Sequence, residues 1–115
     1  EDFVGCFLTR PKPQVQFHPP GRPITLDALA RRLREPGRLT LALPSRGLVR
    51  GDRLFFNGEA HEVSLATLER FQALVRERSL PLPLARGGAD ASDEEEWIEL
   101  LHGWHGAGYL GLQRA

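Results

Sequence analysis

Hydrophobic and polar residues alternate most clearly around Asn57-Gly58, in the middle of the chain. Residues 53–56 and 59–63 have the composition of strands. Asn-Gly between them is the strongest short-range hairpin signal, because both residues tolerate the positive φ of a type I′ turn. A two-residue loop places Arg53 directly opposite Glu62, a pair of opposite charges worth about 0.2–1 kcal/mol. The sequence therefore predicts a β-hairpin at this point.

The predicted hairpin is apolar on both faces near its turn. Leu54 and Phe56 point to one side of the ribbon and Phe55 points to the other, since successive side chains of a strand alternate. A two-stranded ribbon is not stable alone in water. The rest of the chain therefore has to cover both faces.

Three other stretches repeat apolar residues at the helical spacing of three or four positions. Thr25 is the expected N-cap of the first helix and Ser64 of the second. Ser92 forms a capping box with Glu95 at the start of the third. The apolar stripes are Leu26, Leu29, Ala30 and Leu33 in the first helix, Leu65, Leu68, Phe71, Leu74 and Val75 in the second, and Trp97, Leu100, Leu101 and Trp104 in the third.

The segments between these helices complete the predicted fold. Residues 39–63 read as a small antiparallel β-meander, and residues 109–112 as a short closing strand. Leu80-Pro81-Leu82-Pro83 is expected to break the second helix, and residues 87–91, which contain Gly87-Gly88, to form a flexible loop. The prediction is an α+β, winged-helix-like fold with about three helices and a small antiparallel meander containing the hairpin.

A proline-rich segment precedes these elements. Residues 1–24 are expected to form an extended arm that packs on a winged-helix-like domain formed by residues 25–115. The apolar residues among the first ten positions suit a helical turn, and the five prolines that follow exclude a longer helix. Val15 and Phe17, on one face, favour an edge strand along the domain.

Composition places the chain among soluble globular domains. It has 115 residues, of which 41% are hydrophobic and 26% charged. The 15 basic and 15 acidic residues cancel, so no overall field attracts nucleic acid or anionic lipid. No apolar run is long enough to span a membrane, and no membrane partner is expected.

Three further counts bear on origin. The chain has no Met, so we expect a domain excised from a longer protein. Arg supplies 14 of the 15 basic residues, which we interpret as the coding bias of a GC-rich bacterium. The single cysteine, Cys6, cannot form an internal disulfide, in keeping with a reducing cytoplasm.

Metal and catalytic chemistry find little support in the sequence. His102 and His105 are three apart on a helix, but Cys6 and His61 are isolated, and a structural zinc site needs four ligands. No nucleophile motif and no glycine-rich phosphate loop is present. The acidic run at 93–96 is explained by the helix dipole. We therefore expect no catalytic, cofactor-binding or metal-binding residues in this chain.

Nucleic-acid binding is the remaining chemistry to weigh. The third predicted helix begins with acidic residues and carries no Lys or Arg, which disfavours DNA. Arg46, Arg50 and Arg53 in the meander form the candidate partner-binding patch, for RNA or an acidic partner. The alternative is that the arginines lie on solvated faces and pair with nearby glutamates, among them Glu35, Glu69 and Glu77.

Taken together, four stretches resemble the C-terminal winged-helix domain of bacterial JmjC-type cupin oxygenases, the ribosomal oxygenase family. The resemblance extends from Phe3 to Leu112. It rests on Phe7-Leu8-Thr9-Arg10-Pro11-Lys12-Pro13, Phe17-x-Pro19-Pro20, Arg50-Gly51-x-Arg53-Leu54-Phe55-Phe56-Asn57-Gly58-Glu59 and Leu100-Leu101-x-x-Trp104-x-x-x-Gly108-Tyr109-Leu110.

The resemblance implies a parent enzyme with a JmjC barrel that holds Fe(II) and 2-oxoglutarate, a helical dimerisation segment and this winged helix. Such enzymes hydroxylate a ribosomal protein, and their winged helix is acidic or neutral and unsuited to DNA. No histidine here is followed two residues later by Asp or Glu, so the iron ligands are expected outside this chain.

The leading hypothesis is therefore a non-catalytic accessory or protein-interaction domain of such an oxygenase. Its expected partners are the rest of the parent enzyme and the ribosomal-protein substrate, and the resemblance allows a homodimer of the parent. The alternative is a winged-helix RNA-binding module.

The RNA alternative can be tested by a mobility shift. We expect salt-dependent RNA binding to weaken when Arg46, Arg50 and Arg53 are changed. Each arginine that is removed lowers the number of counterions that the RNA phosphates release on binding. Absence of binding at low salt would end this alternative.

Overall fold

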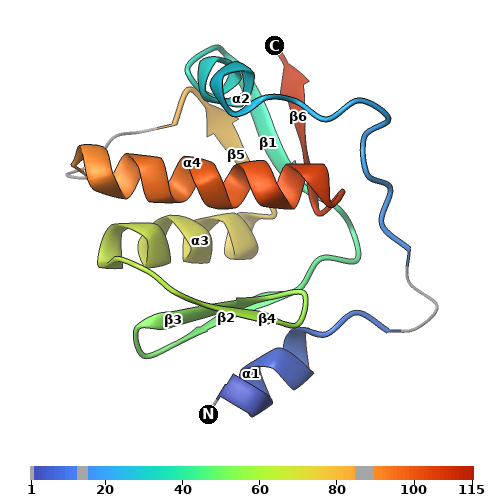
Figure 1. The fold of residues 1–115 in the computed structure, drawn as a ribbon, viewed down its shortest axis with the longest axis vertical. Helices are drawn as coiled ribbons and strands as arrows, with labels where there is room; N and C mark the ends of the chain where they lie inside the picture. The colour runs from blue at the N-terminus through green and yellow to red at the C-terminus, as the bar shows by residue number, and fades with distance from the viewer. Residues whose placement is uncertain (1, 13–15, 85–89) are drawn as a thin grey trace.

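The computed structural model describes residues 2–12, 16–84 and 90–115 and has the predicted α+β class. The helix pair α3 and α4 lies between two small sheets, with α1 and α2 at opposite ends of the molecule (Figure 1). The elements of the described residues are α1 (Asp2–Thr9), α2 (Leu26–Leu33), β1 (Gly37–Leu41), β2 (Gly47–Arg50), β3 (Arg53–Phe56), β4 (Glu59–Glu62), α3 (Leu65–Glu77), β5 (Ser79–Leu82), α4 (Ala91–Gly106) and β6 (Leu110–Arg114).

The predicted hairpin is present in the predicted register. Arg53 lies opposite Glu62, with 3.9 Å between the guanidinium and the carboxylate. Asn57 and Gly58 have φ values of 49° and 90°. Asn57 does more than turn the chain: its backbone N–H donates to the Arg46 carbonyl (2.9 Å), and its side-chain oxygen accepts from the Arg46 N–H (2.9 Å). The turn is therefore bonded to the start of β2.

Both faces of β3 are covered, as the hairpin requires. Phe56 is buried in an aromatic cluster, with ring centroids 4.5 Å from Trp104, 5.5 Å from Phe71 and 5.6 Å from Tyr109. On the other face, Phe55 is 2% exposed because α1 packs on it. The expectation of cover on both sides is confirmed, and α1 supplies one of the two covers.

The predicted meander over residues 39–63 is wrong at its first strand. β1 belongs to the second sheet, between β5 and β6, and β2, β3 and β4 form the hairpin sheet. The prediction that Leu80-Pro81-Leu82 breaks the helix is also wrong: α3 already ends at Glu77, capped by Arg78 at φ 65°, and Leu80-Pro81-Leu82 forms most of β5. Pro81 is tolerated there because β5 is an edge strand. Local alternation predicts a strand but not its partner.

Two of the three predicted N-caps are confirmed. The Thr25 and Ser64 hydroxyls accept from the N–H groups three residues on, at 3.1 and 3.2 Å. The third is wrong: α4 begins earlier, capped by Asp90 in a capping box with Asp93. The two boxes have the same spacing, so sequence alone does not separate them. Ala91 is consequently helical, while Gly87-Gly88 lies outside the described residues.

The apolar stripes are confirmed in most positions. Trp97, Leu101 and Trp104 are buried, as are Leu29 and Leu33 of α2 and Leu68, Phe71 and Leu74 of α3. Leu65, at the start of α3, is 72% exposed, and Leu26, at the start of α2, is 41% exposed. The first turn of each helix extends past the core, which the periodicity does not reveal.

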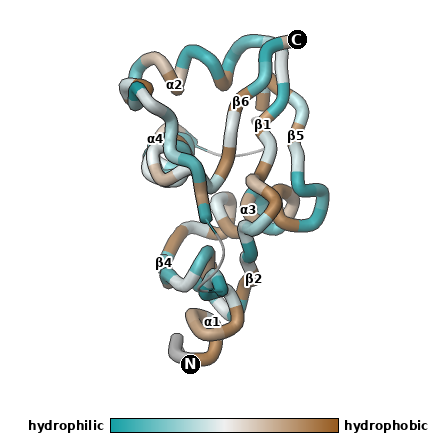
Figure 2. The backbone as a smooth tube through the Cα atoms, turned by 90° about the vertical axis from the view of Figure 1, so that its right-hand side faces the viewer, coloured by the Kyte–Doolittle hydropathy of each residue, from teal (hydrophilic) through white to brown (hydrophobic). Residues whose placement is uncertain are grey.

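Phe17 is not in a strand, contrary to the expectation for the arm. It packs edge-on against Tyr109, with 4.8 Å between ring centroids, and Val15 lies outside the described residues. The tube in Figure 2 shows that α1 is mostly hydrophobic, whereas the arm is mixed. None of the helices in the described part of the chain is long and apolar enough to cross a membrane.

The Glu96 carboxylate links the two long helices. Glu96 on α4 accepts from the Ser64 N–H (3.0 Å), the Ser64 hydroxyl (2.9 Å) and the Thr67 hydroxyl (2.6 Å) at the N-terminus of α3. Burial alone would raise the pKa of Glu96, but these hydrogen bonds outweigh it and hold the pKa below its ordinary value. The ionised carboxylate therefore ties α4 to the start of α3.

Replacing Glu96 with Gln should lower the free energy of unfolding by about 1–3 kcal/mol at neutral pH, because the charged acceptor is lost. Since the folded pKa is lower than the unfolded one, this stabilisation is present above the ordinary glutamate pKa. It is lost as the pH falls through the folded value. Denaturant unfolding should therefore show the two proteins converging in acid. Glu99→Gln, on the same helix, is the control, and an equal loss there would contradict the assignment.

Candidate functional site

Helix α1 is fixed to the hairpin by two small residues. Gly5 lies against the Phe55 ring, and a Cβ at that position would come within 2.5 Å of it. The Thr9 hydroxyl, 1% exposed, donates to the Gly5 carbonyl (3.0 Å) and accepts from the Gly58 N–H (2.9 Å). The inner side of α1 is thus bonded to the turn of the hairpin, and the helix cannot shift without breaking that bond.

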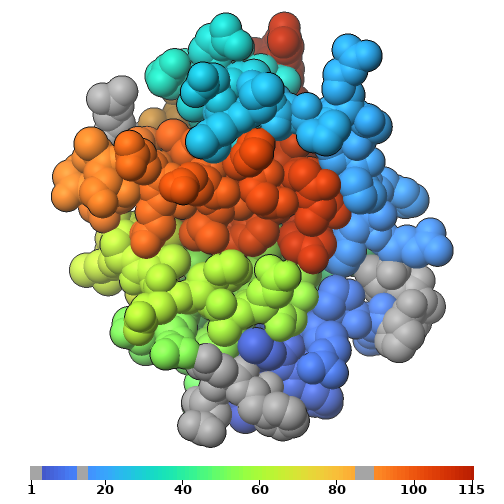
Figure 3. All heavy atoms as spheres, in the orientation of Figure 1, coloured from blue at the N-terminus to red at the C-terminus, as the bar shows by residue number. Residues whose placement is uncertain are grey.

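The opposite side of α1 is apolar and faces solvent. Val4 is 40% exposed, Phe7 61% and Leu8 54%, at positions i, i+3 and i+4. We call these three residues the outer face of α1. In Figure 3 the blue atoms of α1 form one end of the molecule, beside the green atoms of the hairpin. A helix that is apolar on both sides is typical of one that is buried on both sides. Exposed apolar patches of this kind mark interaction sites.

The sequence predicted apolar residues in this helical turn, but it did not show which of them face the hairpin and which face solvent. The missed signal is the pair Gly5 and Thr9, four residues apart, whose small side chains define the side that can approach another element closely. Leu8 and Phe7 then fall on the side that cannot.

The candidate arginine patch is only partly assembled. Arg50 and Arg53 face each other across the β2–β3 turn, but Arg53 also lies 3.9 Å from Glu62. Arg46 precedes the other end of β2, roughly 13 Å away along the strand. The structure brings two of the three together, and whether they bind a partner stays a prediction.

The histidines and the cysteine lie in separate environments. His102 donates from Nε2 to the Ile24 carbonyl (2.8 Å), since a carbonyl can only accept. Burial, the charge of Arg32 and the nearby His102 hold the pKa of His105 below its ordinary value. His61 lies 3.7 Å from Glu59, and Cys6 is on α1. Within residues 2–12, 16–84 and 90–115, no three His, Cys, Asp or Glu side chains are grouped to hold a metal ion.

An acidic groove separates β4 from the N-terminal half of α4. Its volume is about 600 Å³, and its lining includes Glu62, Glu95, Glu96 and Glu99. Carboxylates at these positions repel a phosphate backbone. The groove adds to the charge argument against DNA at this helix, and the absence of DNA binding stays a prediction.

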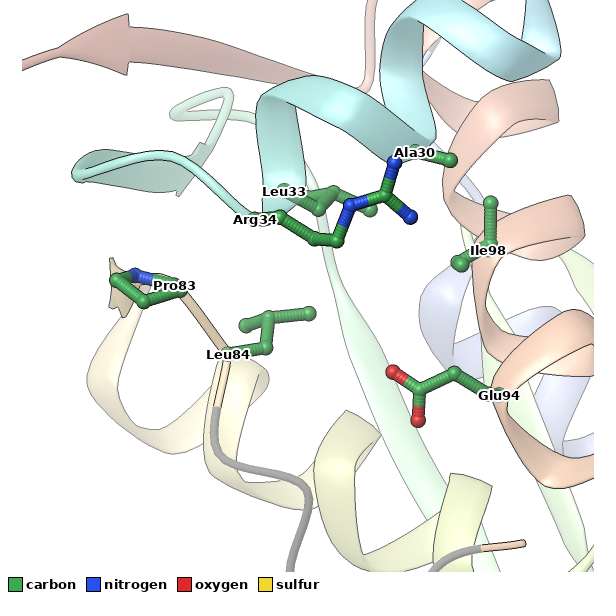
Figure 4. A pocket seen from close by; sticks show the side chains of 7 residues that line it. All are labelled: Ala30, Leu33, Arg34, Pro83, Leu84, Glu94 and Ile98. Carbon is green, nitrogen blue, oxygen red and sulfur yellow. The ribbon is translucent and has the colours of Figure 1, made fainter. Parts of the chain in front are cut away.

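A second cavity, of about 350 Å³, lies between α2, α4 and the segment after β5 (Figure 4). Its walls are mainly apolar, with Arg34 and Glu94 the two charged groups of the lining. Glu94 already accepts from Arg70 at 2.9 Å. The described residues of this lining include no nucleophile and no acid–base pair.

The arrangement defines a winged-helix domain: packed helices with a hairpin wing. The chain matches the model of the ROXA-like winged helix family over residues 1–111. The chain belongs to that family. No curated protein is significantly similar to it in sequence.

Solved structures of YcfD, a ribosomal oxygenase from Escherichia coli, share this fold at 22% identity. One has a TM-score of 0.78 and covers 96% of this chain and 29% of that chain. A complex of YcfD with cobalt and 2-oxoglutarate gives 0.77 with the same coverage, and a third structure gives 0.78 and covers 97% and 30%. The chain spans less than a third of the length of these proteins.

Thr9→Val tests how α1 is attached. The methyl group keeps the shape of the side chain but leaves the Gly58 N–H without its acceptor, so the free energy of unfolding should fall by about 1–2 kcal/mol. Amide hydrogen exchange at Gly58 should also accelerate.

Thr40→Val is the matched control, because among the described residues the Thr40 hydroxyl pairs with the Ser79 hydroxyl (3.1 Å) and with no backbone N–H. Its effect should be smaller. Unchanged exchange at Gly58 in Thr9→Val would show that the hydroxyl does not hold the hairpin turn.

Proposed function

We propose that this chain is a non-catalytic accessory domain of a longer oxygenase, packed on the rest of that enzyme through the outer face of α1. The observation that carries the proposal is a helix docked by Gly5 and Thr9 with Val4, Phe7 and Leu8 turned to solvent. Membership of the ROXA-like family and the partial coverage of YcfD support a longer parent.

The proposed parent is a bacterial, cytoplasmic enzyme of the JmjC cupin type that hydroxylates a ribosomal protein. The sequence resemblance supports this, as does the description of YcfD as a ribosomal oxygenase with a 2-oxoglutarate complex. Fe(II) and 2-oxoglutarate would be held by other parts of the parent. The described residues of this chain offer no 2-His-1-carboxylate set to hold them. The domain would stabilise the enzyme or help to position its protein substrate.

The outer face of α1 suits attachment within one polypeptide. Full burial of a Val or Leu side chain is worth about 1.5–3 kcal/mol, and Val4 and Leu8 are already about half buried, so each has roughly 1 kcal/mol left to gain. That is too little to hold two separate molecules together. It is enough for a tethered contact, where the effective concentration is high.

Leu8→Gln and Val4→Gln test this contact. In the isolated chain each should lower the free energy of unfolding by no more than about 1 kcal/mol, because the side chains are only about half buried. In the parent enzyme they should lower the thermal midpoint by a few degrees and expose α1 to proteolysis. Leu65→Gln, at another exposed leucine on α3, is the control and should change neither.

Deletion of residues 1–115 from the parent tests the broader role. We expect a loss of stability, or weaker binding of the protein substrate, because an apolar surface is uncovered. Folding, activity and substrate affinity that all match the intact enzyme would overturn the accessory role.

A further inference from the structure

A pocket of about 280 Å³ lies between α2 and the end of β6, on the far side of the molecule from α1. It is lined by Ile24, Ala28, Arg31, Arg32, Glu35 and Arg114. α2 and the C-terminal end of β6 are both at the top of Figure 1. Among the described residues, three arginines and one glutamate thus line a small pocket, although the whole chain has no net charge.

Close packing at Gly37 brings the third arginine to this pocket. Gly37 pairs with Arg114 in the β1–β6 ladder, and a Cβ at Gly37 would collide with the Gln113 carbonyl. Ala115 N–H also reaches the Pro36 carbonyl at 3.4 Å. β6 therefore ends directly beside the C-terminus of α2, where Arg31 and Arg32 lie.

These three side chains are not used by the fold. Arg78 donates to three carbonyls of the 42–45 loop, and Arg70 pairs with Glu94. By contrast, among the described residues neither Arg31, Arg32 nor Arg114 has a side-chain hydrogen bond or an ion pair within 4.0 Å. The negative end of the α2 dipole favours Arg31 and Arg32 there. It does not account for Arg114, which comes from a distant strand.

We propose that this pocket is an oxyanion site for a terminal phosphate group. A phosphomonoester carries a charge of about −1.5 to −2 at neutral pH and has three strong acceptor oxygens. Three guanidinium groups offset by one Glu35 carboxylate match that charge better than they match a single carboxylate. Each planar guanidinium can bind phosphate oxygens through two parallel N–H groups.

His105 provides an independent readout of the site. Three causes lower the pKa of His105: burial is the largest, the charge of Arg32 is the second and His102 is the third. A phosphate bound at Arg32 would offset that charge, so the pKa of His105 should rise on binding. Substitutions that merely loosen the fold would not produce a phosphate-dependent shift.

The proposal does not depend on the proposed function, and the 115-residue chain is sufficient to test it. Inorganic phosphate is titrated at low ionic strength while backbone amide and His105 resonances are followed by NMR. We expect shifts confined to α2, the end of β6 and His105. Arg32→Gln and Arg114→Gln should each weaken binding about tenfold. Arg76→Gln, on the exposed side of α3 beside Glu77, should leave it unchanged.

The observations favour a phosphorylated peptide over a nucleic-acid end, because the chain has no net charge to attract a polyanion. A phosphoserine peptide should therefore bind and its unphosphorylated form should not, and this binding should be lost in Arg114→Gln. Binding of a 5′-phosphorylated RNA in place of the peptide would contradict that assignment. No shift with inorganic phosphate, an equal loss in Arg76→Gln, or equally tight binding of acetate would overturn the site itself.

Discussion

Burial of β3 on both faces is the constraint on which the rest of the structure depends. Leu54, Phe55 and Phe56 are at most 2% exposed, although they lie in a strand of a sheet with only three strands. One face needs the aromatic cluster supplied by α3, α4 and the start of β6, and the other needs α1. A single apolar strand thus determines where the first and last elements of the chain must lie.

Hydrogen bonds also connect the hairpin turn to the segments that cover β3. The Asn57 amide donates to the Ser45 hydroxyl (3.3 Å), which donates to the Tyr109 carbonyl (2.8 Å). Thr9 binds the next residue of the turn, Gly58. Both Asn57 and Ser45 are buried, so losing one partner would leave an unsatisfied group, at a cost of about 1–3 kcal/mol. The Asn-Gly pair is therefore a junction between three segments as well as a turn.

The features that sequence predicted are those set by neighbouring residues. The Asn57 turn, the hairpin register, the Thr25 and Ser64 caps and the buried tryptophans all follow from local spacing. The partners of β1, the role of Leu80-Pro81-Leu82 as a strand and the choice between the Asp90 and Ser92 caps depend on distant packing. The outer face of α1 and the arginine-lined pocket beside β6 also differ in whether they depend on local spacing or on distant packing. The helical turn that contains the outer face of α1 could be anticipated, whereas Arg114 joins Arg31 and Arg32 only once β6 pairs with β1.

The position of β1 has a consequence for how the chain folds during synthesis. β1 is the central strand of its sheet, yet both of its neighbours come later in the sequence: Leu39 pairs with Leu80 on one side and Leu112 on the other. The hairpin sheet needs only local pairing and is complete once residue 62 is made. The second sheet has to wait for both partners: β1 carries two unpaired edges until β5 is made, and one until β6 is made. During synthesis the domain thus passes through a stage in which the hairpin sheet is formed while the backbone N–H and C=O groups of β1 are still unpaired.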